Sequence, residues 1–242
     1  QSAGVNIAYY YPFGGAWTAI TDAGFPPNQT TPLALAGPPA FLDGYTFVMD
    51  KNGKIWNSDL NSISAWGGVA AGGINFISAQ AYPDGGRGLM RAGEYIAAFG
   101  THSIEFFANV GNVPGSPLQR VKGATRKIGI PGDGAVMPWP FAYASGEAIY
   151  FVAQEGESGV YHAYKMVGTE VTRISNATVD KIINAYPNQS VCRGVLNLAG
   201  QAHVVFTTSD YTNLAYAVDT NTWWEMKMAG TNVKISACGN DQ

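Results

Sequence analysis

The sequence is poor in charge, cysteine and long apolar runs, and each shortage excludes a class of protein. Charged residues make up 13% of the 242 residues, about half of the roughly 25% that is typical of soluble domains. The 14 basic and 17 acidic residues form no Lys/Arg cluster, so we expect no direct or sequence-specific binding of nucleic acid. Cys192 and Cys238 are too few for a disulfide framework, and we expect reduced thiols. No segment approaches the roughly 18 consecutive apolar residues of a membrane-spanning helix, so no membrane span is expected.

Motifs for nucleotides, metals and nucleophilic catalysis are also missing. There is no G-x-x-x-x-G-K-[ST] loop, and Gly132-Asp133-Gly134 lacks the strand, helix and spacing of a dinucleotide fingerprint. No G-x-S-x-G sequence is present. Three histidines are spread one to a repeat without a neighbouring ligand set, and each is interpreted as a strand residue with a hydrogen-bonded ring rather than a zinc ligand: His102, His162 and His203. We therefore expect no catalytic, cofactor-binding or metal-binding residues and no cofactor.

What the sequence does contain is a repeat of about fifty residues, a period typical of stacked supersecondary units. Four short turns mark it: Asp43-Gly44, Ala92-Gly93, Ser145-Gly146 and Ala199-Gly200. Each turn precedes an apolar, β-prone run: Tyr45 to Met49, Tyr95 to Phe99, Ala148 to Val152, and His203 to Phe206. Apolar strands also precede the turns, as at Phe141 to Ala144 and Val191 to Leu198.

Two further strands complete each repeat. Third strands are predicted at Lys54 to Asn57, Ser103 to Ala108, Val160 to Met166, and Asn213 to Val218. Fourth strands are predicted at Ser64 to Trp66, Leu118 to Lys122, Glu170 to Ile174, and Thr222 to Met226. Each repeat is thus expected to be a four-stranded antiparallel meander.

A single meander cannot bury its apolar face, so four such sheets must pack on one another, and radial packing gives a β-propeller. The alternative is a β-sandwich whose turn spacing is coincidental. Segments Asn6 to Tyr11 and Ala16 to Ile20, joined at Gly14-Gly15, read as strands three and four of a unit whose beginning is missing, and Asn232 to Ala237 as a first strand. We therefore predict one propeller domain over residues 1–242, with four complete blades plus a split blade from the two termini, or a fragment of a larger propeller.

Local signals add detail to this fold. Asn52-Gly53 after Asp50 predicts a type I′ hairpin turn, which also explains why these residues begin like a calcium loop but lack its later ligands. The spacing of apolar residues in Asn176 to Ala185 predicts a short helix capped by Asn176 that serves packing. Two crossings, Gly67 to Gly88 and Asn109 to Pro140, are long enough to suggest function or docking.

One enzymatic alternative comes from the repeat itself. Asp43, Glu94 and Glu147 flank equivalent turns, and paired carboxylates are what glycoside hydrolysis requires. We favour the interpretation that they are solvated turn residues. Seven aromatic residues could line a sugar groove, but at strand positions most are expected in the core or between blades: Tyr9, Tyr10, Tyr11, Trp56, Trp139, Trp223 and Trp224.

Residues 91–111, RAGEYIAAFGTHSIEFFANVG, resemble a known family, the packaged-DNA stabilisation proteins of short-tailed bacteriophages. Similar features recur in order, with similar spacing, over most of the chain: 41–50 with Trp56, 64–66, 79–84, 173–175 and 219–225. The members of this family are longer than this chain, which would then be a truncated or divergent member.

The resemblance implies a structural virion protein of the tail, a head-to-tail connector that stabilises packaged DNA, is assembled in the bacterial host cytoplasm, and permits genome ejection. It implies self-association in a ring around the tail axis and docking of a portal adaptor, tail needle and tailspike, with interface residues that the sequence leaves unknown. It carries over no catalytic residues. The low charge fits a subunit covered by neighbours, and equally a protein with a neutral polar surface. A carbohydrate-binding or glycoside-cleaving propeller is the alternative.

Overall fold

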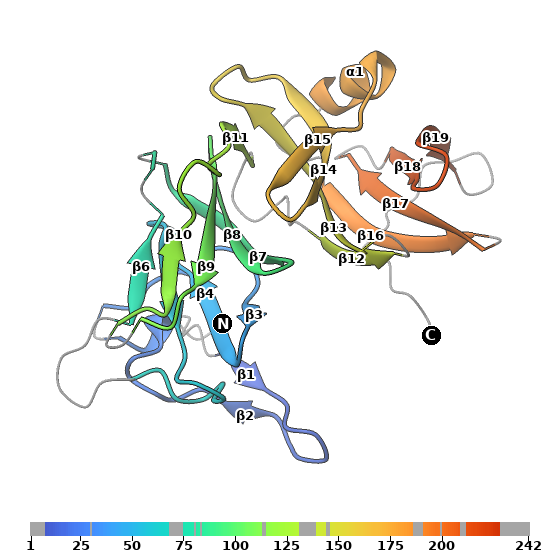
Figure 1. Cartoon of the computed structure of the whole chain (residues 1–242). Coiled ribbons are helices and arrows are strands. Elements are labelled where there is room, and N and C mark those ends of the chain that lie inside the picture. Colours follow the sequence, from blue (N-terminus) through green and yellow to red (C-terminus); the bar gives the residue numbers. More distant parts are fainter. Residues whose placement is uncertain are drawn as a thin grey trace. The chain divides into compact units, whose positions relative to one another are not determined.

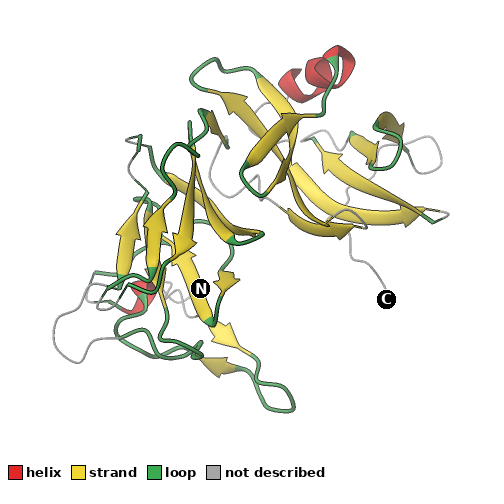
Figure 2. Cartoon of the chain, viewed as in Figure 1, coloured by secondary structure: helices red, strands yellow, loops and turns green. Residues whose placement is uncertain are grey.

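The computed structural model describes residues 8–29, 31–67, 75–79, 81–82, 84–112, 115–130, 139–143, 146–185, 191–198, 200–208 and 212–227, and gives only the backbone of 139–143, 146–147 and 191–198. The chain forms two compact units, one of residues 1–100 and 104–126, the other of residues 101–103 and 127–242. Antiparallel strands dominate the described part of both units (Figure 1, Figure 2).

The first unit contains two four-stranded meanders. One has the order β3-β4-β5-β6, formed by β3 (Ala40–Leu42), β4 (Tyr45–Met49), β5 (Lys54–Asn57) and β6 (Phe76–Ser78). The other has the order β7-β8-β9-β10, formed by β7 (Gly86–Ala92), β8 (Tyr95–Gly100), β9 (Ile104–Asn109) and β10 (Leu118–Arg120). Both are four-stranded antiparallel meanders, as the repeat predicts.

These two sheets share one apolar cluster. Leu42, Phe47 and Ile55 of the first sheet belong to the same buried group as Leu89 and Ile96 of the second. Strands such as β4 and β8 are buried along almost their whole length because neighbours cover both faces, which is why they read in the sequence as continuous apolar runs. Face-to-face packing of successive meanders is what the repeat predicts.

A short hairpin covers the other face of the first sheet. Strands β1 (Tyr9–Tyr10) and β2 (Thr18–Ala19) pair antiparallel, with Tyr10 opposite Thr18. Between this hairpin and the sheet lies a second cluster that includes Phe25 and Trp66, whose rings are 4.9 Å apart. The short 3-10 helix Pro26–Asn28 follows. The predicted pairing around Gly14-Gly15 is therefore confirmed.

The second unit repeats the same plan. Its first sheet runs β12 (Trp139–Tyr143), β13 (Gly146–Glu155), β14 (Tyr161–Val167) and β15 (Glu170–Arg173), and β11 (Ile128–Gly129) pairs with the end of β13. Its second sheet runs β16 (Val191–Leu198), β17 (Gln201–Thr207), β18 (Asn213–Ala217) and β19 (Thr222–Met226). The outermost strands β15 and β19 are largely exposed, as expected for the outer edges of blades.

The predicted helix is also present. Helix α1 (Ala177–Ala185) lies between β15 and β16 in the chain and packs on β14. The Asn176 Oδ1 atom accepts hydrogen bonds from the backbone N–H groups of Thr178 and Val179 at 3.1 and 3.0 Å. This is the N-cap that the sequence predicts, and it satisfies donors that a helix start leaves free.

The position predicted for the fourth strand of the first sheet was wrong. Residues 64–66 are not a strand, because the chain folds back after β5: Asn61 adopts φ 56° and the Asp59 N–H donates to Ala65. Trp66 instead enters the core, with 1% of its surface exposed. The strand comes later, as β6, inside the crossing predicted from Gly67 to Gly88.

Several turns differ in detail. Asn52-Gly53 is not type I′, since only Gly53 has positive φ, 82°; Asp50 pairs with Lys54 around a longer loop and its carboxylate accepts the Asn52 N–H. The two-residue turn with positive φ at both positions is Asp43-Gly44, at 49° and 81°. In the second repeat the predicted pair is one residue early, since Ala92 ends β7, and in the third repeat it is one residue late, since Gly146 begins β13.

Some predictions fall outside the described residues. They concern Cys238, the Gly132-Asp133-Gly134 segment, the strand from Asn232 to Ala237, and the side chain of Cys192. The split blade and the single domain over residues 1–242 therefore stay predictions.

Candidate functional site

The described residues do not show the three turn carboxylates as a catalytic pair. Asp43 and Glu94 are exposed at hairpin ends, and an Asp43 carboxylate oxygen accepts a 3.0 Å hydrogen bond from the Asn109 side chain. Glu147 lies in β13 of the other unit, opposite Ala142 in the register, and its side chain is outside the described part. For Asp43 and Glu94 the interpretation as solvated turn residues is confirmed.

Asp50 is buried, with 1% of its surface exposed, and its carboxylate serves the hairpin. One oxygen accepts hydrogen bonds from the Asn52 and Lys54 N–H groups at 2.8 and 3.1 Å, and the other accepts from the Trp56 indole N–H at 3.1 Å. Such bonds satisfy a buried charge. The hairpin thus accounts for the residues that begin like a calcium loop.

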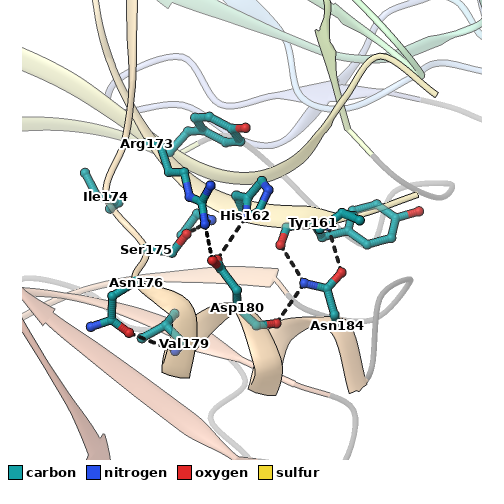
Figure 3. Close-up of polar contacts among 12 residues, drawn as sticks. Tyr161, His162, Arg173, Ile174, Ser175, Asn176, Val179, Asp180 and Asn184 are labelled. Carbon is teal, nitrogen blue, oxygen red and sulfur yellow. Dashed lines mark hydrogen bonds and ion pairs between the residues drawn. The ribbon is translucent and has the colours of Figure 1, made fainter. Parts of the chain in front are cut away.

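A group of connected polar side chains fastens helix α1 to the sheet (Figure 3). Asp180 of α1 is buried and lies 2.9 Å from His162 Nδ1 of β14. Its other oxygen accepts from the Arg173 guanidinium at the end of β15. Burial by itself favours the neutral carboxyl, but hydrogen bonds from Ser175, His162 and Arg173 outweigh it and lower the pKa of Asp180 below its usual value.

Backbone groups complete this attachment. The Asn184 side chain donates to the Tyr161 carbonyl at 2.8 Å and accepts from the Tyr161 N–H at 2.8 Å, a paired contact visible in Figure 3. The Trp223 indole N–H of β19 donates to the Ile174 carbonyl at 2.8 Å, which ties the segment before α1 to the next sheet. The arrangement contains a His, an Asp and an Arg, but these side chains pack the helix against the sheet.

An ion pair between a buried Glu105 and a partly exposed Arg120 links strands in the first unit. Glu105 of β9 is 1% exposed and lies 2.6 Å from Arg120 Nε of β10. Its other oxygen accepts the Ala81 N–H at 2.8 Å, and Arg120 donates to the Ser78 carbonyl at 3.2 Å. Burial raises the pKa of Glu105 above its ordinary value even though Ala81 and Arg120 oppose the shift. The pair therefore links β6 of one sheet to β9 and β10 of the next.

Among the described histidines and aromatic residues the packing interpretation holds with four exceptions, one of which is Trp224, 39% exposed. The Trp139 side chain lies outside the described residues. His162 and His203 are strand residues with bonded rings, the latter 3.0 Å from the Gln201 carbonyl, whereas His102 lies in a bend between β8 and β9 rather than in a strand. Within the described residues no group of three or more metal-ligating side chains gathers. Trp56 is core, but Tyr9 and Tyr11 are 56% and 55% exposed.

Comparison with known proteins identifies the fold and the family. The family described as "Bacteriophage P22 Gp10, beta-propeller" matches residues 39–219, which run from β3 to β18 and so include every strand of the four meanders except β19. The chain belongs to this family. It is a family of phage stabilisation proteins of the virion, not of enzymes, and the resemblance drawn from residues 91–111 is confirmed. The all-β propeller fold predicted from the repeat is confirmed with it.

Solved structures add little to this assignment. BamB from Moraxella catarrhalis aligns at 8% identity and a TM-score of 0.43, covering 81% of this chain and 51% of its own. A fucose-specific lectin from Aleuria aurantia aligns at 13% identity and a TM-score of 0.40, covering 81% and 63%. This chain thus spans about half to two thirds of their length, and a likeness this low identifies no function. No curated protein sequence matches the chain.

No helix among the described residues is long and apolar enough to cross a membrane. The features that sequence reasoning missed are the polar attachment of α1 and the Glu105–Arg120 pair. Their residues lie far apart in the sequence, and no spacing signal connects them.

Proposed function

We propose that this chain is a structural virion protein of a short-tailed phage tail, a head-to-tail connector that stabilises packaged DNA. It docks other tail components, namely a portal adaptor, a tail needle and tailspikes, and self-associates in a ring around the tail axis. It is assembled in the bacterial host cytoplasm and later permits genome ejection. The observation that carries the proposal is the match of residues 39–219 to the P22 Gp10 family.

The physical role of the chain in this proposal is steric and mechanical. Sheets that share apolar clusters and cross-sheet contacts such as Glu105–Arg120 make a stiff body, since packed interiors have low compressibility. Low overall charge suits a subunit whose surface is largely covered by protein neighbours. We also propose that residues 1–242 form one propeller domain and that the chain performs no catalysis.

The proposal is tested by removing the gene from its phage and complementing it in trans. We expect particles that package DNA but lose it on standing, so that nuclease digests the released genome, and we expect complementation to restore retention. Particles that keep their DNA without the protein would contradict the proposal. A glycan array probed with the purified chain should give no binding, whereas specific glycan binding would favour the carbohydrate-binding alternative.

A further inference from the structure

The Asn52-Gly53 pair lies in the turn between β4 and β5 and is the single Asn-Gly pair in the sequence. Asn52 is exposed, so water reaches this residue. A backbone nitrogen can attack the side-chain amide carbon of the asparagine before it, and glycine hinders this attack least because it has no side chain. The pair is therefore a candidate site of deamidation.

The reaction needs no partner other than water. The Gly53 nitrogen loses its proton and bonds to Asn52 Cγ, the Cγ–Nδ2 bond breaks, and ammonia leaves with that proton. Water then opens the cyclic imide at either of its carbonyl carbons. Opening at one carbon leaves aspartate, whereas opening at the other leaves isoaspartate, in which the main chain runs through the side-chain carbons and is longer by one atom.

The folded turn engages the attacking nitrogen. The Gly53 N–H donates to the Asp50 carbonyl at 3.0 Å, and the Asn52 N–H donates to Asp50 Oδ1 at 2.8 Å. Gly53 is buried, and its φ of 82° is one that glycine adopts far more readily than other residues. To react, the Gly53 nitrogen must give up its bond to Asp50 and reach Asn52 Cγ. The rate of deamidation therefore depends on how often the turn opens.

The same turn is a junction between segments of the first unit. The Lys51 N–H donates to the Ala34 carbonyl at 3.0 Å, and the Lys51 carbonyl accepts the Gly86 N–H at 3.0 Å. The Gly53 carbonyl accepts the Ala79 N–H at 2.9 Å. Ala79 directly follows β6 and Gly86 begins β7. An added main-chain atom in this turn would therefore disturb the connection between the two sheets.

We propose that Asn52 is a deamidation site, that opening of the turn at residues 50–54 sets its rate, and that the isoaspartate product loosens the junction with β6 and β7. The exposed asparagine, the glycine that follows it and the hydrogen bonds that the reaction must break support this inference. It concerns the chemical ageing of the folded chain and does not rest on the proposed virion role.

The experiment follows deamidation by mass spectrometry of peptides from the full chain, incubated folded and unfolded in guanidinium chloride at neutral and mildly alkaline pH. Asn61, exposed and followed by Ser62, is the internal control, and Asn52→Gln is the control variant, which should not form the product. We expect Asn52 to react before Asn61 in both states and faster at the higher pH. In the folded chain it should react about tenfold or more slowly than in the unfolded chain, which corresponds to an opening free energy of about 1.4 kcal/mol or more.

Two outcomes of this comparison would overturn the inference. One is a folded chain in which Asn52 reacts as fast as in the unfolded chain, because the turn would then exert no control. The other is Asn61 reacting before Asn52, because the site would then be the wrong one.

Asp50→Ala separates opening of the turn from global unfolding. It removes the acceptor of the Asn52 and Lys54 N–H groups. Once circular dichroism has checked folding, we expect faster deamidation of Asn52 and an unchanged rate at Asn61. No acceleration at Asn52, or equal acceleration at both asparagines, would overturn control by the turn.

The effect of the product on the junction is measured separately. Asn52→Asp reproduces the added charge without the added main-chain atom, so its urea midpoint should stay near that of wild type. The isoaspartate form, separated by chromatography, should unfold at a lower urea concentration. An isoaspartate form as stable as Asn52→Asp would overturn the effect on the junction.

Discussion

Replacing Asp180 with asparagine tests whether a buried carboxylate fastens helix α1 to its sheet. In the folded chain this side chain is 12% exposed and joins His162 and Arg173. Helix α1 has only nine residues, and helices this short are marginal without tertiary contacts. Losing the charge should therefore loosen the helix before it affects the strands.

The expected loss is about 1.5 kcal/mol at pH 7. Hydrogen bonds to a charged group contribute about 1.5–3 kcal/mol, but the Arg173 side chain is 43% exposed, and solvent screens its share to below about 1 kcal/mol. Since the pKa of Asp180 is lowered in the folded state, its stabilisation is present above the ordinary value of 3.8 and disappears as pH falls through the folded pKa. The difference between wild type and variant should thus shrink as pH falls below 3.8 and through the lowered pKa of Asp180.

The assay is thermal unfolding and amide hydrogen exchange of residues 177–185 at pH 7 and at low pH. A loss of about 1.5 kcal/mol lowers Tm by about 3–6 °C in a protein of this size, and protection should fall first in α1. Glu157→Gln, at an exposed position of the same unit, is the control and should change little. An equal deficit for the Asp180 variant at both pH values would refute the reasoning, because packing loss does not titrate.

Three further changes test the sheets. Leu89 is fully buried in the apolar cluster between two sheets, so Leu89→Ala should lower the free energy of unfolding in urea by about 2–5 kcal/mol. Leu60→Ala, at an exposed position, should lower it little. Equal effects of the two changes would argue against face-to-face packing of the sheets. Asp50→Ala should cost about 2–4 kcal/mol, because it leaves the Trp56 N–H buried without an acceptor, and an unchanged midpoint would contradict that. Burial raises the pKa of Glu105 above the ordinary value of 4.5, so the free energy of unfolding should fall as pH rises through the folded-state pKa. Glu105→Gln should flatten this part of the profile of stability against pH. A slope retained in the variant would reject the assignment of this pH dependence to Glu105.

Periodic local signals made most of the fold predictable. The runs at 45–49, 54–57 and 191–198 are β4, β5 and β16, with the predicted bounds. For β4 and β5 the reason is that central strands buried on both faces appear in the sequence as short apolar runs between turns. The N-cap at Asn176 was equally readable. Side-chain chemistry confined to neighbouring residues is what a sequence displays directly.

The errors arose where tertiary contacts override local preference. The segment 64–66 looks like a strand, but the Trp66 ring packs against Phe25 in the core and the chain bends to place it there. The Asn52-Gly53 turn is not of the predicted type because the buried Asp50 carboxylate accepts hydrogen bonds from the N–H groups of Asn52 and Lys54. The partners of Asp180 and Glu105 depend on how strands and the helix align in space, which residue spacing does not encode.

The most direct test of the account is a cryo-electron microscopy reconstruction of the virion to which this chain belongs. The account predicts several copies around the tail axis below the portal, each with successive four-stranded sheets related by rotation about a common centre. Copies absent from the tail, or a chain folded as two flat sheets facing one another, would contradict it.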